Sequence, residues 1–176
     1  NGIYANRSII TDNIIYTYDN SSNSGSYGYG IRSYAEQNNR SLIEGNVIEA
    51  EYETRGIWAS YADISNNTIT GISNNEWSIG GGTENSIQNN TITNMREGLH
   101  LDGYTGWVVN NNIIQVHYDN GIYMNNSSGT FTYNLIISGG TGIHCQNQSG
   151  ENFSHNTIIG NGGDYGIHIS NLSQPV

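Results

Sequence analysis

A short motif recurs along this sequence at nearly constant intervals, and this recurrence limits the folds that the chain can adopt. Each copy has an apolar residue, two variable residues, an asparagine, one more variable residue and an isoleucine. The peptide ISNNTIT at 64–70, for example, returns at 87–93 as IQNNTIT. The repeated asparagines are Asn13, Asn46, Asn67, Asn90, Asn112, Asn134 and Asn156, which lie 33, 21, 23, 22, 22 and 22 residues apart by subtraction.

A second motif, glycine followed by isoleucine or leucine, alternates with the first. Its copies are Gly2-Ile3, Gly30-Ile31, Gly56-Ile57, Gly98-Leu99, Gly121-Ile122, Gly142-Ile143 and Gly166-Ile167, while Ser78-Ile79 stands where one more copy is expected. The one interval of 33 residues contains extra residues around 18–29 and 36–40, which we interpret as insertions. The sequence is therefore a series of units of one kind, interrupted near its beginning.

Units of about 22 residues that are rich in Ile and Thr are typical of three short strands and their turns. A single strand cannot bury its apolar side, but stacked coils can when each strand pairs with its counterpart about 4.8 Å away. Parallel crossovers are right-handed almost without exception. We therefore predict one all-β domain over residues 1–176, a single-stranded right-handed parallel β-helix (solenoid) of seven to eight coils.

The asparagines have a structural explanation in such a fold. We expect them at sharp bends, in the left-handed conformation that asparagine tolerates best after glycine. Stacked above one another, their amides would form an internal ladder of hydrogen bonds, which avoids the cost of about 1–3 kcal/mol for a buried group without a partner. The ladder would replace disulfides, because Cys145 is the only cysteine. Ligand binding by these asparagines is the alternative.

Both motifs occur together in GIHCQNQSGENFSHNTII at 142–159, and with them the sequence resembles the pectate-lyase-like superfamily of right-handed β-helices. The resemblance covers essentially the whole chain and implies the fold. It does not select an activity, because relatives include polysaccharide lyases, polygalacturonases, mannuronan epimerases, phage tailspikes, periplasmic copper-site maturation proteins and surface repeat proteins. It also implies that any substrate groove lies on the outer face of the Gly-Ile strand.

The residue after each Gly-Ile pair points outward in this arrangement, and so does the residue two positions later. The first outward row is Tyr4, Arg32, Trp58, Gly80, His100, Tyr123, His144 and His168, and the second is Asn6, Tyr34, Ser60, Gly82, Asp102, Asn125, Gln146 and Ser170. Rings beside amides and charges suit a polysaccharide or surface glycan. We expect carbohydrate contact by Arg32, Tyr34, Trp58, His100, Tyr123, Asn125, His144 and His168. The alternative is that stacked rings only stabilise the strands.

The best candidate for catalysis is the segment REGLHLDG, which contains Arg96, His100 and Asp102. Tyr123 is expected one coil above His100. A His or Tyr base, with an arginine that neutralises a uronate carboxylate, would suit a lyase or an epimerase. Glu97 and Asp102 would instead suit glycoside hydrolysis, which needs two carboxyl groups at a fixed separation.

Other features argue against a complete active site. The chain has no lysine, which the resembling lyases use together with arginine, and its only proline is Pro175, so the Asp-Pro-His-Glu signature of mannuronan epimerases is absent. We expect no metal site and no cofactor, because parallel histidine side chains on one flat face diverge. The leading hypothesis is an extracellular scaffold that contacts glycans, or assembles end to end as a surface or filament component. A polysaccharide-processing enzyme is the alternative.

Charge and hydropathy exclude two further classes of partner, nucleic acids and the membrane interior. The formal net charge is −10, and all five basic residues are arginines. Nucleic-acid binding rests on clustered positive charge, so we expect no nucleic-acid partner. No apolar run approaches the roughly 20 residues that cross a bilayer, so we expect no membrane insertion.

The expected location is extracellular or on the cell surface. Possible N-glycosylation sites begin at Asn6, Asn20, Asn39, Asn66, Asn89, Asn125, Asn126, Asn147, Asn152 and Asn171. The sequence begins with neither Met nor a basic-then-apolar leader, so we expect a processed chain or part of a longer protein. Open ends of a β-helix expose unpaired strands, and we therefore expect self-association through them.

Overall fold

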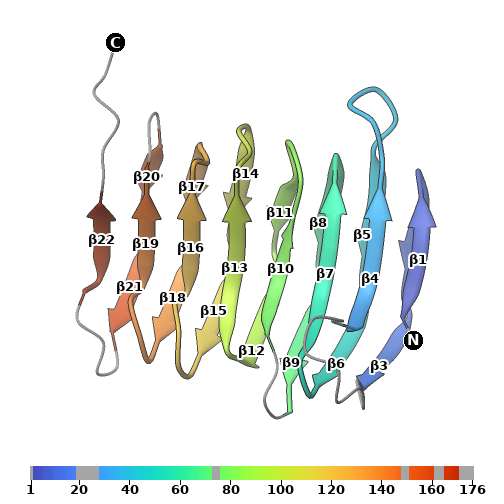
Figure 1. Ribbon diagram of the computed structural model, residues 1–176, viewed down its shortest axis with the longest axis horizontal. Coiled ribbons are helices and arrows are strands. Elements are labelled where there is room, and N and C mark those ends of the chain that lie inside the picture. Colours follow the sequence, from blue (N-terminus) through green and yellow to red (C-terminus); the bar gives the residue numbers. More distant parts are fainter. Residues whose placement is uncertain (1, 19–27, 73–75, 148–150, 161–164, 171–176) are drawn as a thin grey trace.

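The computed structural model describes residues 2–18, 28–72, 76–147, 151–160 and 165–170. Within them the chain forms 22 β-strands and no helix. The strands stand in rows, and the chain advances along the long axis from one end of the rows to the other (Figure 1). Most of the predicted insertion at 18–29 lies outside the described residues, as do Asn20 and Asn171.

Consecutive strands belong in turn to three sheets. The first sheet has eight strands: β1 (Ile3–Asn6), β4 (Gly28–Tyr34), β7 (Thr54–Ser60), β10 (Trp77–Gly81), β13 (Glu97–Asp102), β16 (Ile122–Asn125), β19 (Ile143–Gln146) and β22 (Ile167–Ser170). The second has seven: β2 (Ile9–Thr11), β5 (Ser41–Glu44), β8 (Ala62–Ser65), β11 (Ser86–Gln88), β14 (Trp107–Asn110), β17 (Gly129–Thr132) and β20 (Asn152–Ser154). The third also has seven: β3 (Ile14–Tyr18), β6 (Val47–Glu51), β9 (Thr68–Gly71), β12 (Thr91–Met95), β15 (Ile113–Val116), β18 (Leu135–Ser138) and β21 (Thr157–Gly160).

Each coil contributes one strand to each sheet, and neighbouring strands in a sheet pair in parallel, so the predicted parallel solenoid is confirmed. The two copies of the heptapeptide lie in register, with Ile64 opposite Ile87 and Ile69 opposite Ile92. Seven stacked strands enclose six turns of backbone, and the eighth strand of the first sheet begins another. The number of full turns is therefore slightly lower than the seven to eight coils predicted.

Inward-pointing isoleucines fill the interior of the coils. In the second sheet Ile43, Ile64 and Ile87 occupy equivalent positions and are fully buried. In the third sheet Ile48 and Ile69 repeat the pattern. β-Branched side chains favour strands and pack well on a pleated surface, so identical residues one coil apart build a continuous core.

The glycine of the Gly-Ile motif is required by close packing. A Cβ on Gly98 would lie 2.2 Å from the carbonyl oxygen of Gly121 and 2.5 Å from Cγ2 of Ile114. Gly142 is enclosed in the same way, with Cγ2 of Ile158 at 2.3 Å from the position of a Cβ. Neither Gly98 nor Gly142 has a left-handed backbone, so lack of space selects glycine here.

The predicted asparagine ladder is confirmed at the corner between the second and third sheets. The backbone N–H and Nδ2 of Asn90 donate to Oδ1 of Asn112, one coil further on, at 2.9 and 3.0 Å. Nδ2 also donates to the carbonyl oxygens of Ile64 and Gln88. Oδ1 of Asn90 accepts the equivalent pair of bonds from Asn67. The same pair of bonds joins Asn13 to Asn46, Asn46 to Asn67, Asn112 to Asn134 and Asn134 to Asn156.

The prediction that these asparagines are left-handed is wrong. The left-handed residue is the one before each ladder asparagine. These residues, with φ between 55° and 66°, are Asp12, Gly45, Asn66, Asn89, Asn111, Tyr133 and His155. Because the chain turns at the preceding residue, the asparagine itself can direct its amide inward and along the axis.

A second set of polar side chains, which the sequence analysis missed, lines the corner between the first and second sheets. Oδ1 of Asn85 accepts the backbone N–H of Ala62 at 2.8 Å. Oγ of Ser127 accepts the N–H of Tyr104 at 3.3 Å and donates to the carbonyl oxygen of Leu101. Residue type varies from coil to coil at this corner, so the sequence contains no repeated residue that would have predicted these hydrogen bonds.

Candidate functional face

The first sheet carries the predicted outward row. Strand register aligns its members Tyr4, Arg32, Trp58, Gly80, His100, Tyr123, His144 and His168. The neighbours of His100 in β13, Leu99 and Leu101, are fully buried, whereas His100 is half-buried. The row therefore faces outward, as alternation along a strand predicts.

Gly80 does not interrupt the rings, because Trp77 occupies the space beside it. A Cβ on Gly80 would lie 3.0 Å from Cζ3 of Trp77. The indole stacks on the imidazole of His100, with 5.9 Å between ring centroids and 17° between the planes. Trp77 is only 7% exposed, so its ring belongs to the outer face and is also packed against the neighbouring side chains.

Trp77 belongs to an outward row that sequence reasoning missed. This row stands one residue before each Gly-Ile or Ser-Ile pair and contains Tyr29, Arg55, Trp77, Glu97, Asn120, Thr141 and Tyr165. Register joins Tyr29 to Arg55 and Trp77 to Glu97. Simple alternation would turn these residues inward, but the alternation breaks at the tightly packed glycine position. The regular position within the repeat was the signal that could have identified them.

The line of neighbouring rings continues toward the C-terminal coils. Ring centroids lie 5.0 Å apart for His100 and Tyr123, 5.6 Å for Tyr123 and His144, and 4.8 Å for His144 and His168. Trp77, His100, Tyr123, His144 and His168 therefore form one line across five strands, which we call the ring row.

Toward the N-terminal coils, guanidinium groups lie between aromatic rings. Cζ of Arg32 is 5.1 Å from the ring centroid of Tyr29, 5.2 Å from that of Tyr34 and 5.6 Å from that of Trp58. One Nη of Arg32 donates to the hydroxyl of Tyr34. Nε of Arg32 is buried and has no hydrogen-bond partner among the described residues.

Arg55 extends this group to the ring row. Its Cζ lies 4.6 Å from the centroid of the Trp77 ring and 5.6 Å from that of Tyr29, and its Nη1 donates to the hydroxyl of Tyr29 at 2.8 Å. Cation–π contacts of this kind hold a guanidinium group in one orientation. We call Tyr29, Arg32, Tyr34, Arg55 and Trp58 the arginine cluster.

Glu97 orients the imidazole of His100. Nδ1 of His100 lies 2.6 Å from Oε1 of Glu97, whose side chain is 13% exposed. Asn120 donates to the other oxygen of the same carboxyl group at 3.4 Å. With its proton on Nδ1, His100 donates to Glu97 and retains Nε2 as an acceptor. The imidazole is thus fixed between Trp77 and Tyr123.

Two rings of the row have shifted pKa values. Burial raises the pKa of Tyr123 above its ordinary value of 10.0, and the charges of Asp102 and Glu97 act in the same direction. Burial lowers the pKa of His144 below 6.5, and neighbouring His168 lowers it further. At neutral pH both rings are therefore predominantly uncharged.

The second outward row supplies polar groups beside the rings. The hydroxyl of Tyr123 donates to Oε1 of Gln146 at 3.2 Å. Nδ2 of Asn125 donates to Oδ1 of Asp102 at 2.9 Å, and Asn147 donates to Oδ1 of Asn125 at 3.1 Å. These amides and carboxylates form a half-exposed band parallel to the ring row.

The predicted catalytic residues are only partly brought together. His100 and Tyr123 are adjacent, and Asp102 ends β13 on the same face. Arg96 precedes β13, about 20 Å along the strand from Asp102 at 3.3 Å per residue. Its Nε lies 2.8 Å from Oδ2 of Asp119, so this guanidinium is held at the corner between the third and first sheets.

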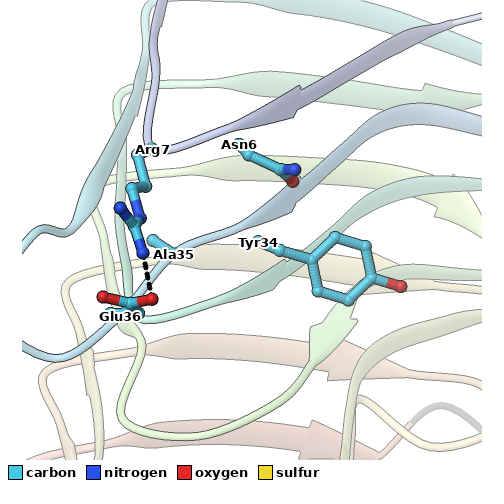
Figure 2. A pocket seen from close by; sticks show the side chains of 5 residues that line it. All are labelled: Asn6, Arg7, Tyr34, Ala35 and Glu36. Carbon is cyan, nitrogen blue, oxygen red and sulfur yellow. Dashed lines mark hydrogen bonds and ion pairs between the residues drawn. The ribbon is translucent and has the colours of Figure 1, made fainter.

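A hollow of about 390 Å³ lies beside the first two coils. Its lining contains Asn6, Arg7, Tyr34, Ala35 and Glu36. Figure 2 shows Arg7 paired with Glu36, while the ring of Tyr34 extends away from that pair. The two charged groups of the hollow thus neutralise each other, and Tyr34 connects it to the arginine cluster.

Among the described residues, no group of three or more His, Cys, Asp and Glu side chains is placed to hold a metal ion. The described part of the chain also lacks any helix with the length and apolarity needed to cross a bilayer. Of the predicted glycosylation sites, Asn6, Asn39, Asn66, Asn89, Asn126 and Asn152 are exposed, and Asn125 and Asn147 are half-buried. Their modification stays a prediction.

Comparison with known proteins agrees with this architecture. Residues 56–175, more than half of the chain, match the family described as "Right handed beta helix region". No curated protein and no solved structure matches the chain significantly. The resemblance to the pectate-lyase-like superfamily is consistent with both the match and the stacked parallel coils. The chain therefore belongs to the right-handed β-helix family.

Proposed function

We propose that the outer face of the first sheet binds a carbohydrate chain that lies across the strands, along the ring row and the arginine cluster. The observation that carries this proposal is the line of five adjoining rings, made continuous by Trp77 beside Gly80. The rigid coil stack would serve as the scaffold. A role outside the cell or at its surface fits this activity, and it is part of the proposal.

The chemistry of the face supports a sugar ligand. Sugar rings present apolar C–H faces, which pack on aromatic rings, and hydroxyl groups around their edges. The ring row offers the first kind of contact, and the amides of Asn125, Gln146 and Asn147 beside it offer donors and acceptors for the second. Apolar rings with a few oriented polar groups are the usual composition of ligand sites.

The arginine cluster favours a ligand with acidic groups. The protein carries a net charge of −10, and Arg7, Arg40 and Arg96 pair with carboxylates elsewhere on its surface. Arg32 and Arg55 are oriented by rings on the proposed binding face. Guanidinium groups fit carboxylate and sulfate groups through paired N–H donors. We therefore propose a uronate-containing or sulfated glycan.

Binding can be tested with purified neutral, uronate-containing and sulfated polysaccharides by affinity gel electrophoresis and calorimetry. We expect binding to at least one acidic polymer, with weaker binding at high salt. Trp58→Ala should lower the affinity about tenfold, a typical loss for an aromatic contact residue. Tyr16→Ala, which removes a ring 67% exposed on the third sheet, is the matched control and should change nothing.

Two outcomes would overturn the proposal. One is that no polysaccharide of the panel binds. The other is that Tyr16→Ala weakens binding as much as Trp58→Ala, because binding would then not depend on the first sheet.

Polysaccharide processing is the second candidate function, and the Glu97–His100 pair favours it. An imidazole held by a carboxylate is a common general base, and the ring of His100 lies beside that of Tyr123. The raised pKa of Tyr123 suits a proton donor at neutral pH. Incubation with the same polymers should then release unsaturated or reducing ends. His100→Gln should abolish this release while leaving binding in place; unchanged release would exclude His100 as the base.

A further inference from the structure

The charged side chains of the candidate face are separated along the axis of the coil stack. Within the described strands of the first sheet, the outward arginines lie in two neighbouring strands, Arg32 in β4 and Arg55 in β7. The outward carboxylates, Glu97 and Asp102, both lie in β13. The strand between β7 and β13, β10, carries no charged residue. The face is therefore cationic at β4 and β7 and anionic at β13.

The carboxylate of Asp102 keeps its charge at the surface of this face. Asp102 is exposed, and its Oδ1 accepts a hydrogen bond from Nδ2 of Asn125, a neutral group, at 2.9 Å. Burial raises the pKa of the Tyr123 hydroxyl, and the charges of Asp102 and then of Glu97 raise it further. The negative potential of β13 therefore extends to the next strand of the sheet, β16.

Arg96, the residue before β13, does not offset this potential. Its Nε lies 2.8 Å from Oδ2 of Asp119, and its Nη1 lies 3.8 Å from Oε1 of Glu76. Two carboxylates thus accompany one guanidinium group at this corner, which carries more negative than positive charge.

The strands that follow β13 in the first sheet are uncharged on their outer side. β16, β19 and β22 contain no Asp, Glu, Lys or Arg. Burial and the neighbouring His168 lower the pKa of His144, so this imidazole is predominantly uncharged at neutral pH. These strands offer rings, amides and hydroxyl groups to a ligand and no site for an acidic group.

We propose that the face selects a glycan in which neutral sugar units separate the acidic ones, and that it disfavours a chain with an acidic group on every unit. This inference rests on the proposed function and deepens it. Parallel strands lie about 4.8 Å apart, and a pyranose unit in an extended chain has a similar length, so successive units can follow successive strands. A unit over β4 or β7 then places a carboxylate or sulfate beside Arg32 or Arg55. The unit over β13 meets Asp102 and Glu97 and has to be neutral.

Asp102 is the specificity-determining residue in this arrangement. A fully acidic polymer brings like charge to β13, and unfavourable contacts of this kind are a usual means of rejecting a wrong partner. The net charge of −10 repels a dense polyanion as well. A mixed chain avoids the repulsion at β13 and retains both the arginine contacts and the ring contacts.

The test uses one uronate polymer as a graded series, in which increasing fractions of the carboxyl groups are converted to neutral methyl esters. The backbone and the chain length stay constant, so only the charge density varies. Calorimetry at one ionic strength measures the affinity of each member. We expect the affinity of wild type to pass through a maximum at intermediate esterification, with the fully acidic member bound about threefold more weakly than the best one, as for an exposed charge pair.

Three substitutions locate the origin of this maximum. Asp102→Asn removes the charge and keeps the oxygen that accepts from Asn125, so it should raise the affinity for the fully acidic member about threefold and shift the maximum toward higher charge. Arg32→Gln should shift the maximum toward the neutral end of the series. Glu49→Gln is the matched control, because it removes one negative charge from the outer side of β6 in the third sheet. It should leave the maximum in place.

The outcomes separate this inference from the proposed function. Tightest binding at either end of the series would overturn the inference while carbohydrate binding stands. An unchanged maximum in Asp102→Asn, or an equal shift in Glu49→Gln, would also overturn it, because the charge of β13 would then not set the preference. Absence of binding to every member of the series and to every other polysaccharide would overturn the proposed function together with the inference.

Discussion

The asparagine ladder and the ring row both run along the axis of the coil stack, the ladder through seven coils and the ring row across five strands, and each takes one residue from successive coils. The ladder has the same residue in seven coils, lies inside, and meets its hydrogen-bonding requirements from coil to coil. The ring row changes from Trp to His to Tyr, lies on the surface, and leaves parts of its rings exposed.

The two rows differ because backbone hydrogen bonds constrain the residue type at ladder positions and do not constrain it at ring positions. At a ladder position the neighbouring coil offers N–H groups and carbonyl oxygens at fixed places, which only an asparagine amide satisfies on both sides. At a ring position the backbone is already paired within the sheet, so several side chains fit. Outward positions are therefore free to acquire a ligand-binding role, and the inner ones are not.

The largest effect is expected from breaking the ladder in its middle. Asn90→Ala would remove the acceptor of the buried N–H and Nδ2 of Asn67 and a donor to the buried carbonyl oxygen of Ile64. Because each such group costs about 1–3 kcal/mol, the free energy of unfolding should fall by at least ~3 kcal/mol. Urea denaturation measures this change.

Asn110→Ala is the matched control, because this asparagine is half-exposed in an adjacent strand and has one long side-chain hydrogen bond of 3.4 Å. It should cost no more than about 0.5 kcal/mol. Equal costs for the two variants would contradict a special role of the ladder.

A smaller loss is expected from the glycine motif. Gly98→Ala would push a methyl group against the carbonyl oxygen of Gly121 and the side chain of Ile114. Overpacking of this kind costs about 1–3 kcal/mol. Gly166→Ala changes the same motif in the last coil, where nothing lies within 4 Å of the new Cβ, and it should be nearly neutral in the same thermal-unfolding assay. A neutral Gly98→Ala would show that the motif is not selected by space.

Replacing Ser78 should raise the free energy of unfolding, whereas the substitutions above lower it. Its hydroxyl is fully buried and has no hydrogen-bond partner among the described residues. Ser78→Ala should therefore stabilise the protein by about 1 kcal/mol. Ser127→Ala removes a buried hydroxyl that bonds to Leu101 and Tyr104, and it should destabilise by a similar amount. Calorimetric unfolding of both variants checks the signs, and destabilisation by both would refute the distinction.

The smallest effect concerns protonation of the ring row. The pKa of His144 is lowered in the folded state by burial and by His168, so the unfolded state binds the proton more readily. Stability should therefore fall as the pH drops below about 6.5, and His144→Gln should reduce that loss. Imidazole titration by NMR should also show the pKa of His144 rising in His168→Gln. An unchanged titration would exclude the His168 contribution.

Much of the fold could be predicted from the sequence, because identical residues stack on one another in a solenoid. The spacing of Asn67, Asn90 and Asn112 predicted both the coil length and the ladder. The error about which residue is left-handed arose because the ladder asparagine and its predecessor are often both asparagine, as at Asn66 and Asn67. Residue identity alone does not distinguish the residue whose left-handed backbone turns the chain from the residue whose side chain forms the ladder hydrogen bonds.

The candidate functional face was predicted less completely. Alternation along the strand found His100, Tyr123 and their row, but it did not place Trp77 beside them or show that Glu97 contacts His100. At the glycine of each motif the strand packs so closely on the next coil that alternation fails. Side chains before the glycine then return to the outer face, where they complete the ring row and hold His100.

The sequence by itself thus determined the period, the parallel stacking and the inner ladder, since these depend on contacts between equivalent residues. Only the tertiary structure decided which rings touch, which arginines lie between them and how Glu97 orients His100. Several of those contacts combine different positions of the repeat on the first sheet, as Trp77 does with His100 in the next strand and Glu97 does with His100 within β13. Their geometry depends on side-chain packing, which changes with residue type from coil to coil, and on the break in strand alternation at the glycine of the motif.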